Sequence, residues 1–153
     1  MNRHKSRDKK AEDKPKVFLD ANIWLSAIFW PEGKASQAVN KAWLNYRVFT
    51  SDYVIAEVSR KAKERFPHQG WRVEQFFQRS KYNLTILDTP EETVAEELLV
   101  RDNGDRPIVR AAIREGVDII LSGDRDLLEA GLVYPAVFTV HDFLENNPSG
   151  KDT

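Results

Sequence analysis

The chain has 153 residues, of which 41% are hydrophobic and 31% are charged, so it suits one folded domain and not a wholly disordered chain. The 23 basic and 24 acidic side chains give a formal net charge of −1, which excludes a strongly cationic nucleic-acid binder as a description of the whole chain. Cysteine is absent and histidine occurs three times, which excludes disulfide frameworks and cysteine–metal sites. Any metal would take oxygen ligands, which favours magnesium, manganese or calcium.

Short apolar runs alternate with longer segments of helical periodicity along the chain. Strands are predicted at 17–19, 47–50, 84–87, 118–121 and 137–140. Helices are predicted at 22–29, 35–44, 52–66, 71–81, 90–100, 105–115, 124–130 and 141–145. The strands are continuously apolar, as in sheets buried on both faces, and the alternation requires crossover connections. We therefore predict a three-layer α/β/α sandwich with a mostly parallel central sheet.

The two ends of the chain differ in charge from its body. Residues 1–16 carry a net charge of +4 and the remainder carries −5. We predict a basic flexible tail over 1–15, a globular domain over 16–146 and a flexible end over 147–153. The sequence shows no secretory signal and no apolar stretch of membrane-spanning length, so we expect no membrane association and a cytoplasmic location.

Carboxylates come at the ends of two predicted strands. Asp20 directly follows the first strand, and Asp124 follows the fourth after Ser122 and Gly123, with Asp126 shortly beyond. Ligand sites of parallel sheets lie at the carboxyl ends of the strands, so these acids are candidates for a metal site. Taken singly, each could be a helix N-cap instead.

Two further acids fit the same site. Asp105 opens a predicted helix with Pro107 in its first turn, and Glu57 flanks the buried stripe of the helix over 52–66. Taken singly, Asp105 is an N-cap and Glu57 is a solvated partner of Lys61. Together, carboxylates that converge on one cleft repel each other unless a divalent cation compensates their charge. Magnesium or manganese in such a set suits the hydrolysis of a phosphodiester by water.

The ordered motifs of the chain resemble those of PIN-domain proteins. They are VFLDAN at 17–22, the helix of Glu57, DNGDRPI at 102–108, LSGDRDLL at 121–128 and VFTVHDFL at 137–144. The resemblance covers residues 16–146 and is closest to the VapC-like toxins of prokaryotic toxin–antitoxin systems. It implies an α/β/α sandwich, a ribonuclease that depends on Mg²⁺ or Mn²⁺, an RNA substrate, a small antitoxin protein as partner, and a homodimer.

The resemblance also implies roles for single residues. The four acids of the family, which are catalytic and bind metal, fall on Asp20, Glu57, Asp105 and Asp124. Asp126 would assist as a further metal ligand, and Asn22 and Ser122 would orient the carboxylates. Asp102 is the alternative to Asp105, which we prefer because the family acid directly precedes this apolar helix.

Basic side chains crowd the end of the helix that carries Glu57. Arg60, Lys61 and Lys63 could bind RNA phosphates near the metal, and so could Arg106, which follows the third acid. Equally, these side chains could form solvated helix faces, and Arg106 could lower the affinity for metal. The basic tail is likewise either an arm that touches RNA or a solubilising leader.

Two other functions are weighed against the ribonuclease. A PIN-like module that binds RNA or protein without catalysis is favoured mildly by Arg106, but the complete set of four acids argues against it. A phosphatase of the haloacid-dehalogenase type needs Asp-x-Asp after the first strand, whereas this chain has Asp20-Ala21-Asn22. We therefore predict a metal-dependent endoribonuclease, the toxin of a type II toxin–antitoxin system.

Overall fold

The computed structural model describes residues 13–146, and five short strands form one sheet within them. The strands are β1 (Lys16–Leu19), β2 (Arg47–Ser51), β3 (Leu84–Leu87), β4 (Ile119–Leu121) and β5 (Ala136–Phe138). Their order across the sheet is β3-β2-β1-β4-β5, and every neighbouring pair is parallel. The predicted parallel sheet is confirmed, and it is parallel throughout. Most of the predicted tail (1–15) and the predicted end (147–153) lie outside the described residues.

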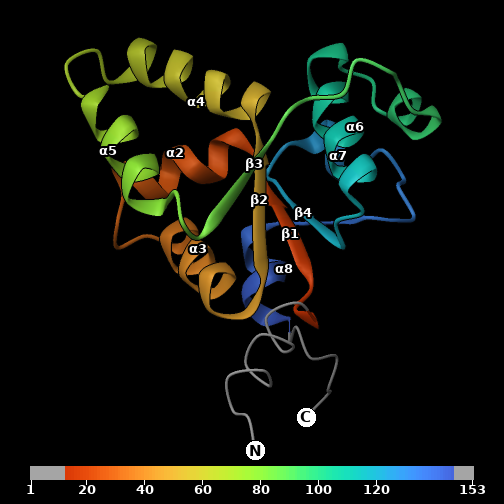
Figure 1. Ribbon diagram of the computed structural model, residues 1–153, viewed down its shortest axis with the longest axis horizontal. Helices are drawn as coiled ribbons and strands as arrows, with labels where there is room; N and C mark the ends of the chain where they lie inside the picture. Colours follow the sequence, from red (N-terminus) through yellow and green to blue (C-terminus); the bar gives the residue numbers. More distant parts are fainter. Residues whose placement is uncertain (1–12, 147–153) are drawn as a thin grey trace, which may run out of the picture.

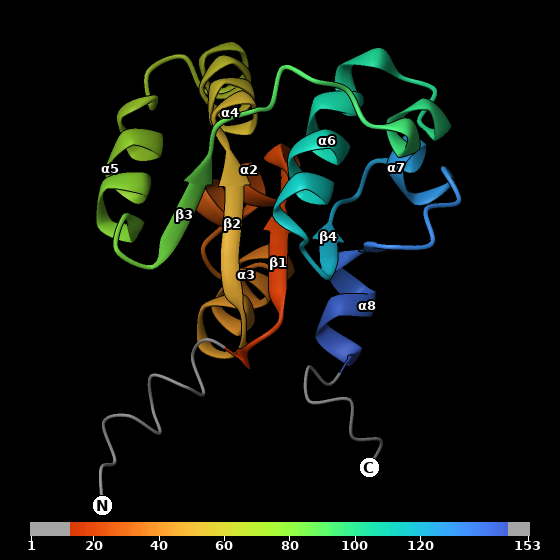
Figure 2. The ribbon, with the colours of Figure 1, turned by 45° about the vertical axis from the view of Figure 1, so that its right-hand side comes forward.

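Helices cover both faces of this sheet. They are α2 (Ala21–Phe29), α3 (Lys34–Asn45), α4 (Asp52–Arg65), α5 (Trp71–Ser80), α6 (Arg106–Glu115), α7 (Arg125–Leu128) and α8 (Val140–Glu145), with two 3₁₀ helices, η1 (Ala95–Leu99) and η2 (Asn103–Asp105). Figures 1 and 2 show α2 and α3 against one face of the sheet and α6 against the other. The predicted three-layer sandwich is therefore confirmed. Across the described residues, no helix is both long and apolar enough to cross a membrane.

The core fixes the point at which β1 ends. Helix α2 is buried around most of its circumference, and its Trp24 is fully buried. The indole N–H of Trp24 donates to the carbonyl oxygen of Leu19 at 3.1 Å, and the hydroxyl of Thr50 donates to the same oxygen at 3.0 Å. These bonds satisfy a buried backbone acceptor that lies directly before Asp20. The core therefore holds Asp20 at the end of the sheet.

The segment between β3 and η2 corrects one prediction. A helix was expected over 90–100, but only Ala95–Leu99 is helical, and it is a 3₁₀ turn. The segment is held instead by side chains of α6, because the guanidinium of Arg110 donates to the carbonyl oxygen of Pro90 at 3.0 Å and to both carboxylate oxygens of Glu97 at 2.9 Å. A side chain of α6 thus bonds to the carbonyl oxygen of Pro90, which the predicted helix would have paired with one of its own N–H groups.

The remaining elements begin and end within two residues of their predicted bounds. Helix α6 ends where the sequence indicates, at Gly116, whose φ of 74° lies in the left-handed region that glycine adopts without a steric penalty. The turn leads directly into β4, which carries the chain back toward the acidic end of the sheet.

Candidate metal centre

Asp20 and Asp124 follow the neighbouring strands β1 and β4, and Ser122 joins them. Asp20 is buried, and its Oδ1 accepts the backbone N–H of Ala21 at 2.7 Å. The hydroxyl of Ser122 donates to Asp20 Oδ2 at 2.7 Å and accepts the backbone N–H of Asp124 at 3.0 Å. Asp124 in turn caps α7, since its Oδ1 accepts the N–H of Asp126 at 2.8 Å. The three predicted residues Asp20, Ser122 and Asp124 therefore form one bonded unit.

Asp105 lies beside this unit at the start of α6. Its side chain is buried, and burial together with the nearby carboxylate of Asp124 raises its pKa to about 8, with smaller contributions from Asp20 and Asp102. No hydrogen-bond donor among the described residues reaches its buried Oδ2. Burial also raises the pKa of Asp20, against the opposing bond from Ser122. The raised pKa values show that these carboxylates would repel one another if they were all ionised, and a divalent cation relieves that repulsion.

Asp102 and Asp126 complete a tight acidic group with Asp105. One carboxylate oxygen from each of the three residues lies within 4.8 Å of the others. Asp102 Oδ1 accepts the N–H of Gly104 at 2.9 Å, which bends the chain into η2 and turns Asp102 and Asp105 to the same side. Asp102 was expected as an alternative to Asp105, whereas the structure places both in one group. The Asp-Asn-Gly turn is the signal that could have shown this.

One face of α4 borders these acids and carries Tyr53, Glu57 and Lys61, which are spaced four residues apart. The hydroxyl of Tyr53 donates to the carbonyl oxygen of Gly104 at 2.5 Å, which ties α4 to the η2 turn. The ammonium of Lys61 donates to Asn22 Oδ1 at 3.1 Å and lies 4.0 Å from Glu57 Oε2. Tyr53 was not predicted as a site residue, because its bond to Gly104 joins positions that lie far apart in the sequence.

Charged side chains of α4 act on residues of the site. After burial, the charges of Glu57, Asp105 and Asp102 raise the pKa of Tyr53. The charge of Lys61 in turn works against the rise in the pKa of Asp20. Lys61 is thus an electrostatic neighbour of Asp20, and Tyr53 is an electrostatic neighbour of Glu57, Asp102 and Asp105.

The other basic residues proposed to contact RNA lie in different settings. Arg60 pairs with Glu57 at 2.9 Å and with Glu64 at 2.8 Å. The Nε of Arg106 donates to the carbonyl oxygen of Val100 at 2.9 Å. Lys63 is exposed, and no ion pair of the described residues includes it. Of the four predicted RNA contacts, Lys63 is therefore the one whose charged group has no hydrogen bond or ion pair among the described residues.

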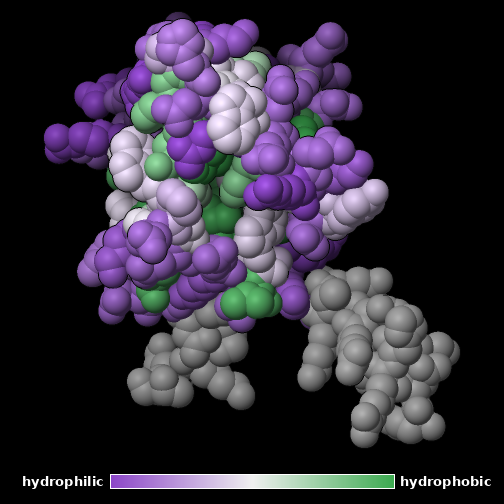
Figure 3. All heavy atoms as spheres, turned by 90° about the vertical axis from the view of Figure 1, so that its left-hand side faces the viewer, coloured by the Kyte–Doolittle hydropathy of each residue, from purple (hydrophilic) through white to green (hydrophobic). Residues whose placement is uncertain are grey.

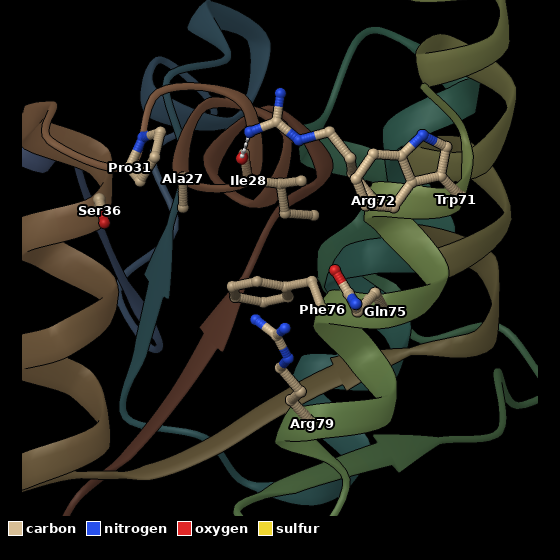
Figure 4. A pocket seen from close by; sticks show the side chains of 9 residues that line it. All are labelled: Ala27, Ile28, Pro31, Ser36, Trp71, Arg72, Gln75, Phe76 and Arg79. Carbon is tan, nitrogen blue, oxygen red and sulfur yellow. Dashed lines mark hydrogen bonds between the residues drawn. The ribbon is translucent and has the colours of Figure 1, made fainter. Parts of the chain in front are cut away.

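A separate hollow of about 260 Å³ lies between α2, α3 and α5. Seen from this side, hydrophobic side chains form the floor of a depression in a largely hydrophilic surface (Figure 3). Figure 4 shows Arg72, Phe76 and Arg79 extending from α5 toward α2, where Arg72 donates to the carbonyl oxygen of Ile28 at 3.1 Å. None of the predicted site acids lines this hollow, so it is distinct from the candidate metal centre.

The acidic residues fit a hard divalent cation. Every available ligand is a carboxylate oxygen, which suits Mg²⁺ or Mn²⁺. The buried Oδ2 of Asp105 lacks a donor, and the raised pKa values of Asp20 and Asp105 show that the arrangement disfavours their charged forms without a cation. Asp102, Asp105 and Asp126 are already close enough together to bind one ion.

Comparisons with known proteins give the family and the fold of the chain. The family model described as "PIN domain" matches residues 16–126, while no curated protein sequence matches the chain. Among solved structures, VapBC2 of Rickettsia felis bound to a promoter DNA fragment aligns at 16% identity with a TM-score of 0.62, over 81% of this chain and 98% of that chain.

Two further structures are similar. VapC20 of Mycobacterium tuberculosis, described as a toxin that cleaves the sarcin–ricin loop, aligns at 18% identity with a TM-score of 0.56, over 76% of this chain and 96% of that chain. DNA-bound VapBC of Salmonella typhimurium aligns at 15% identity with a TM-score of 0.60, over 82% and 98%. At these identities the structures show a shared fold, and the family match covers most of the chain. The chain belongs to the PIN-domain family.

Proposed function

We propose that this protein is an endoribonuclease that hydrolyses RNA phosphodiesters with Mg²⁺ or Mn²⁺. The observation that carries the proposal is Asp105, a buried carboxylate with an orphaned oxygen and a raised pKa, packed among other acids. We propose that its catalytic residues are Asp20, Glu57, Asp105 and Asp124. The same four, with Asp126 and the structurally adjacent Asp102, would hold the metal.

A bound divalent cation would supply a positive charge that orients the phosphodiester and lowers the pKa of an attacking water. The protein's own residues prepare the site for it. Ser122 holds one oxygen of Asp20 and leaves Oδ1 bonded only to the backbone N–H of Ala21. Burial and the nearby charge of Asp124 raise the pKa of Asp105, so Asp105 would keep its proton until a cation replaces it. Lys63 presents a free positive charge to which an RNA phosphate could bind.

The proposal is tested by mapping RNA ends after induction of the protein in cells. We expect new 5′ ends at a small number of sites with the parent and none with Asp20→Asn, whose amide keeps the shape of the side chain. A matched control is Asp142→Asn, an exposed acid on α8 far along the chain from the proposed ligands, which should cleave like the parent. Equal cleavage by Asp20→Asn and the parent would overturn the assignment.

We further propose that the protein is the toxin of a type II toxin–antitoxin system with a small antitoxin as partner. The similar solved structures support this, since VapBC2 and VapBC are described as complexes, as is FitAB bound to a DNA fragment at 17% identity and a TM-score of 0.59. Co-expression with the product of the neighbouring reading frame should abolish the cleavage and yield a stable complex. A homodimer and a cytoplasmic location remain predictions.

The non-catalytic binding module is the second candidate. Arg106 beside Asp105 was the observation that favoured it, but the Nε of Arg106 is bonded to the carbonyl oxygen of Val100. Binding of RNA without new 5′ ends, by protein that also shows no response to Mn²⁺, would establish the module instead.

A further inference from the structure

Lys61 differs from the other basic residues of α4 because it turns into the acidic site. Its ammonium donates to Asn22 Oδ1 at 3.1 Å and lies 4.0 Å from Glu57 Oε2. Its side chain is 22% exposed, against 58% for Arg60 on the neighbouring position. Asn22 belongs to α2, in the first turn after Asp20. Lys61 therefore bridges α4 and α2, beside Glu57 on the first helix and within the first turn after Asp20 on the second.

An ordinary surface ion pair does not account for this position. A Glu and a Lys spaced four residues apart on a helix often pair at the surface. Here, however, Arg60 already pairs with Glu57 Oε1 at 2.9 Å, and Lys61 makes its shorter contact with Asn22, which lies on another helix. The ammonium of Lys61 therefore lies between α4 and the start of α2, where its charge acts on Asp20.

We propose that Lys61 is a resident counter-cation of the acidic site, which supplies positive charge when no metal is bound and competes with the divalent cation for the acids. This inference rests on the proposed function, because it assumes that the acids bind a metal.

The physical basis is the charge balance of the site. Without metal, an ammonium beside Glu57 and Asn22 offsets part of the repulsion among the carboxylates. With a divalent cation in place, the same ammonium repels it. Lysine is suited to this exchange, because its point charge is carried on a flexible stem that can withdraw toward solvent. Removal of the charge should therefore favour metal binding and disfavour the metal-free protein.

The test is calorimetric titration of the full chain with MnCl₂. The variants are Lys61→Met, which removes the charge and keeps the stem, Lys61→Arg, which keeps the charge, and Lys63→Met, which removes an exposed charge from the same helix. We expect Lys61→Met to lower the Kd for Mn²⁺ by roughly three- to thirtyfold. Lys61→Arg and Lys63→Met should stay within about twofold of the parent. In EDTA, Lys61→Met should melt below Lys63→Met.

Each outcome separates the two proposals. If the parent takes up no Mn²⁺, the proposed metal centre itself is wrong. If the parent binds Mn²⁺ and Lys61→Met binds it equally or more weakly, the counter-cation is wrong, and Lys61 instead holds Asn22 and Glu57 in position for the metal. Equal tightening by Lys61→Met and Lys63→Met would also overturn the inference, because it would reflect net charge alone.

Discussion

The hydroxyl of Ser122 donates to the buried carboxylate of Asp20 at 2.7 Å across 102 positions of sequence. The bond follows from the register of the sheet. Leu19 lies opposite Leu121 in the parallel pair of β1 and β4. The residues that follow them, Asp20 and Ser122, therefore lie next to each other where the two strands end. Register thus converts two distant sequence motifs into one site.

Ser122→Ala should destabilise the metal-free protein at neutral pH. The change removes the donor to Asp20 Oδ2 and the acceptor of the Asp124 N–H, both at a residue with no exposure. We expect a loss of about 1–3 kcal/mol in the free energy of unfolding, measured by urea denaturation in EDTA. Ser122→Thr, which keeps the hydroxyl, should recover part of it. Unchanged stability of Ser122→Ala would contradict the described bond.

Asp105→Asn should make the metal-free protein more stable while it abolishes activity. The amide carries no charge and can donate to the neighbouring Asp124, so repulsion within the group falls. We expect about 1–3 kcal/mol of added stability at pH 8 in EDTA, and no stabilisation by Mn²⁺. Asp20→Asn and Asp124→Asn should shift stability in the same direction. Variants that all melt below the parent in EDTA would show that the acids do not repel one another.

The stability of the metal-free parent should fall as the pH rises from about 4 to about 8, because the folded state keeps the proton of Asp105 in this range and the unfolded chain does not. The folded state holds the proton of Asp105 up to a pKa of about 8, whereas the unfolded chain loses it near 3.8. Folding therefore takes up a proton in this range, and it is disfavoured as protons become scarce.

Melting curves of the parent and Asp105→Asn in EDTA check this pH dependence. The difference between them isolates Asp105 from the other titrating groups, and it should widen steadily from pH 5 to pH 8. Saturating Mn²⁺ should remove the widening, because a cation replaces the proton. A constant difference across this range would mean that the pKa of Asp105 is not raised.

Arg110→Met should destabilise the protein far more than Arg114→Met, although both arginines lie on α6. Arg110 binds both oxygens of Glu97, which is 3% exposed, and holds the segment that leads to Asp102. Loss of the partner of a buried carboxylate should cost about 2–4 kcal/mol in urea denaturation. Arg114 pairs with the exposed Glu92 at 3.5 Å, so its loss should cost less than about 1 kcal/mol. The double variant Arg110→Met, Glu97→Leu should regain much of the lost stability, because no buried charge is left without a partner. Equal losses for Arg110→Met and Arg114→Met would show that the Arg110–Glu97 pair does not hold this segment.

Much of the fold could be predicted from the sequence because local patterns determined it. Continuous apolar strands indicated a doubly covered parallel sheet, and breakers such as Gly116 marked where helices end. The segment over 90–100 could not be predicted in this way. Its start resembles a helix N-terminus, but its polar groups bond to Arg110 on α6, and no local pattern reports a partner that far along the chain.

The candidate site also has residues that the sequence could predict and residues that it could not. Asp20 and Asp124 follow buried strands, so topology alone placed them at one edge of the sheet. The joint presence of Asp102 and Asp105 depends on the η2 turn, and the roles of Tyr53 and Lys61 depend on how α4 packs beside that turn and α2. These contacts join different secondary-structure elements, so the hydrophobic periodicity of the sequence could not predict them.

The proposed metal-dependent cleavage is tested most directly by cleavage of one purified RNA by the parent and by Asp105→Asn, each titrated with MnCl₂ from a metal-free start. We expect the parent to cleave only with metal, at a rate that saturates at the Mn²⁺ concentration at which calorimetry shows the site filled. Asp105→Asn should not cleave at any concentration. Cleavage by the parent in EDTA, or cleavage by Asp105→Asn at the parental rate, would contradict the proposal.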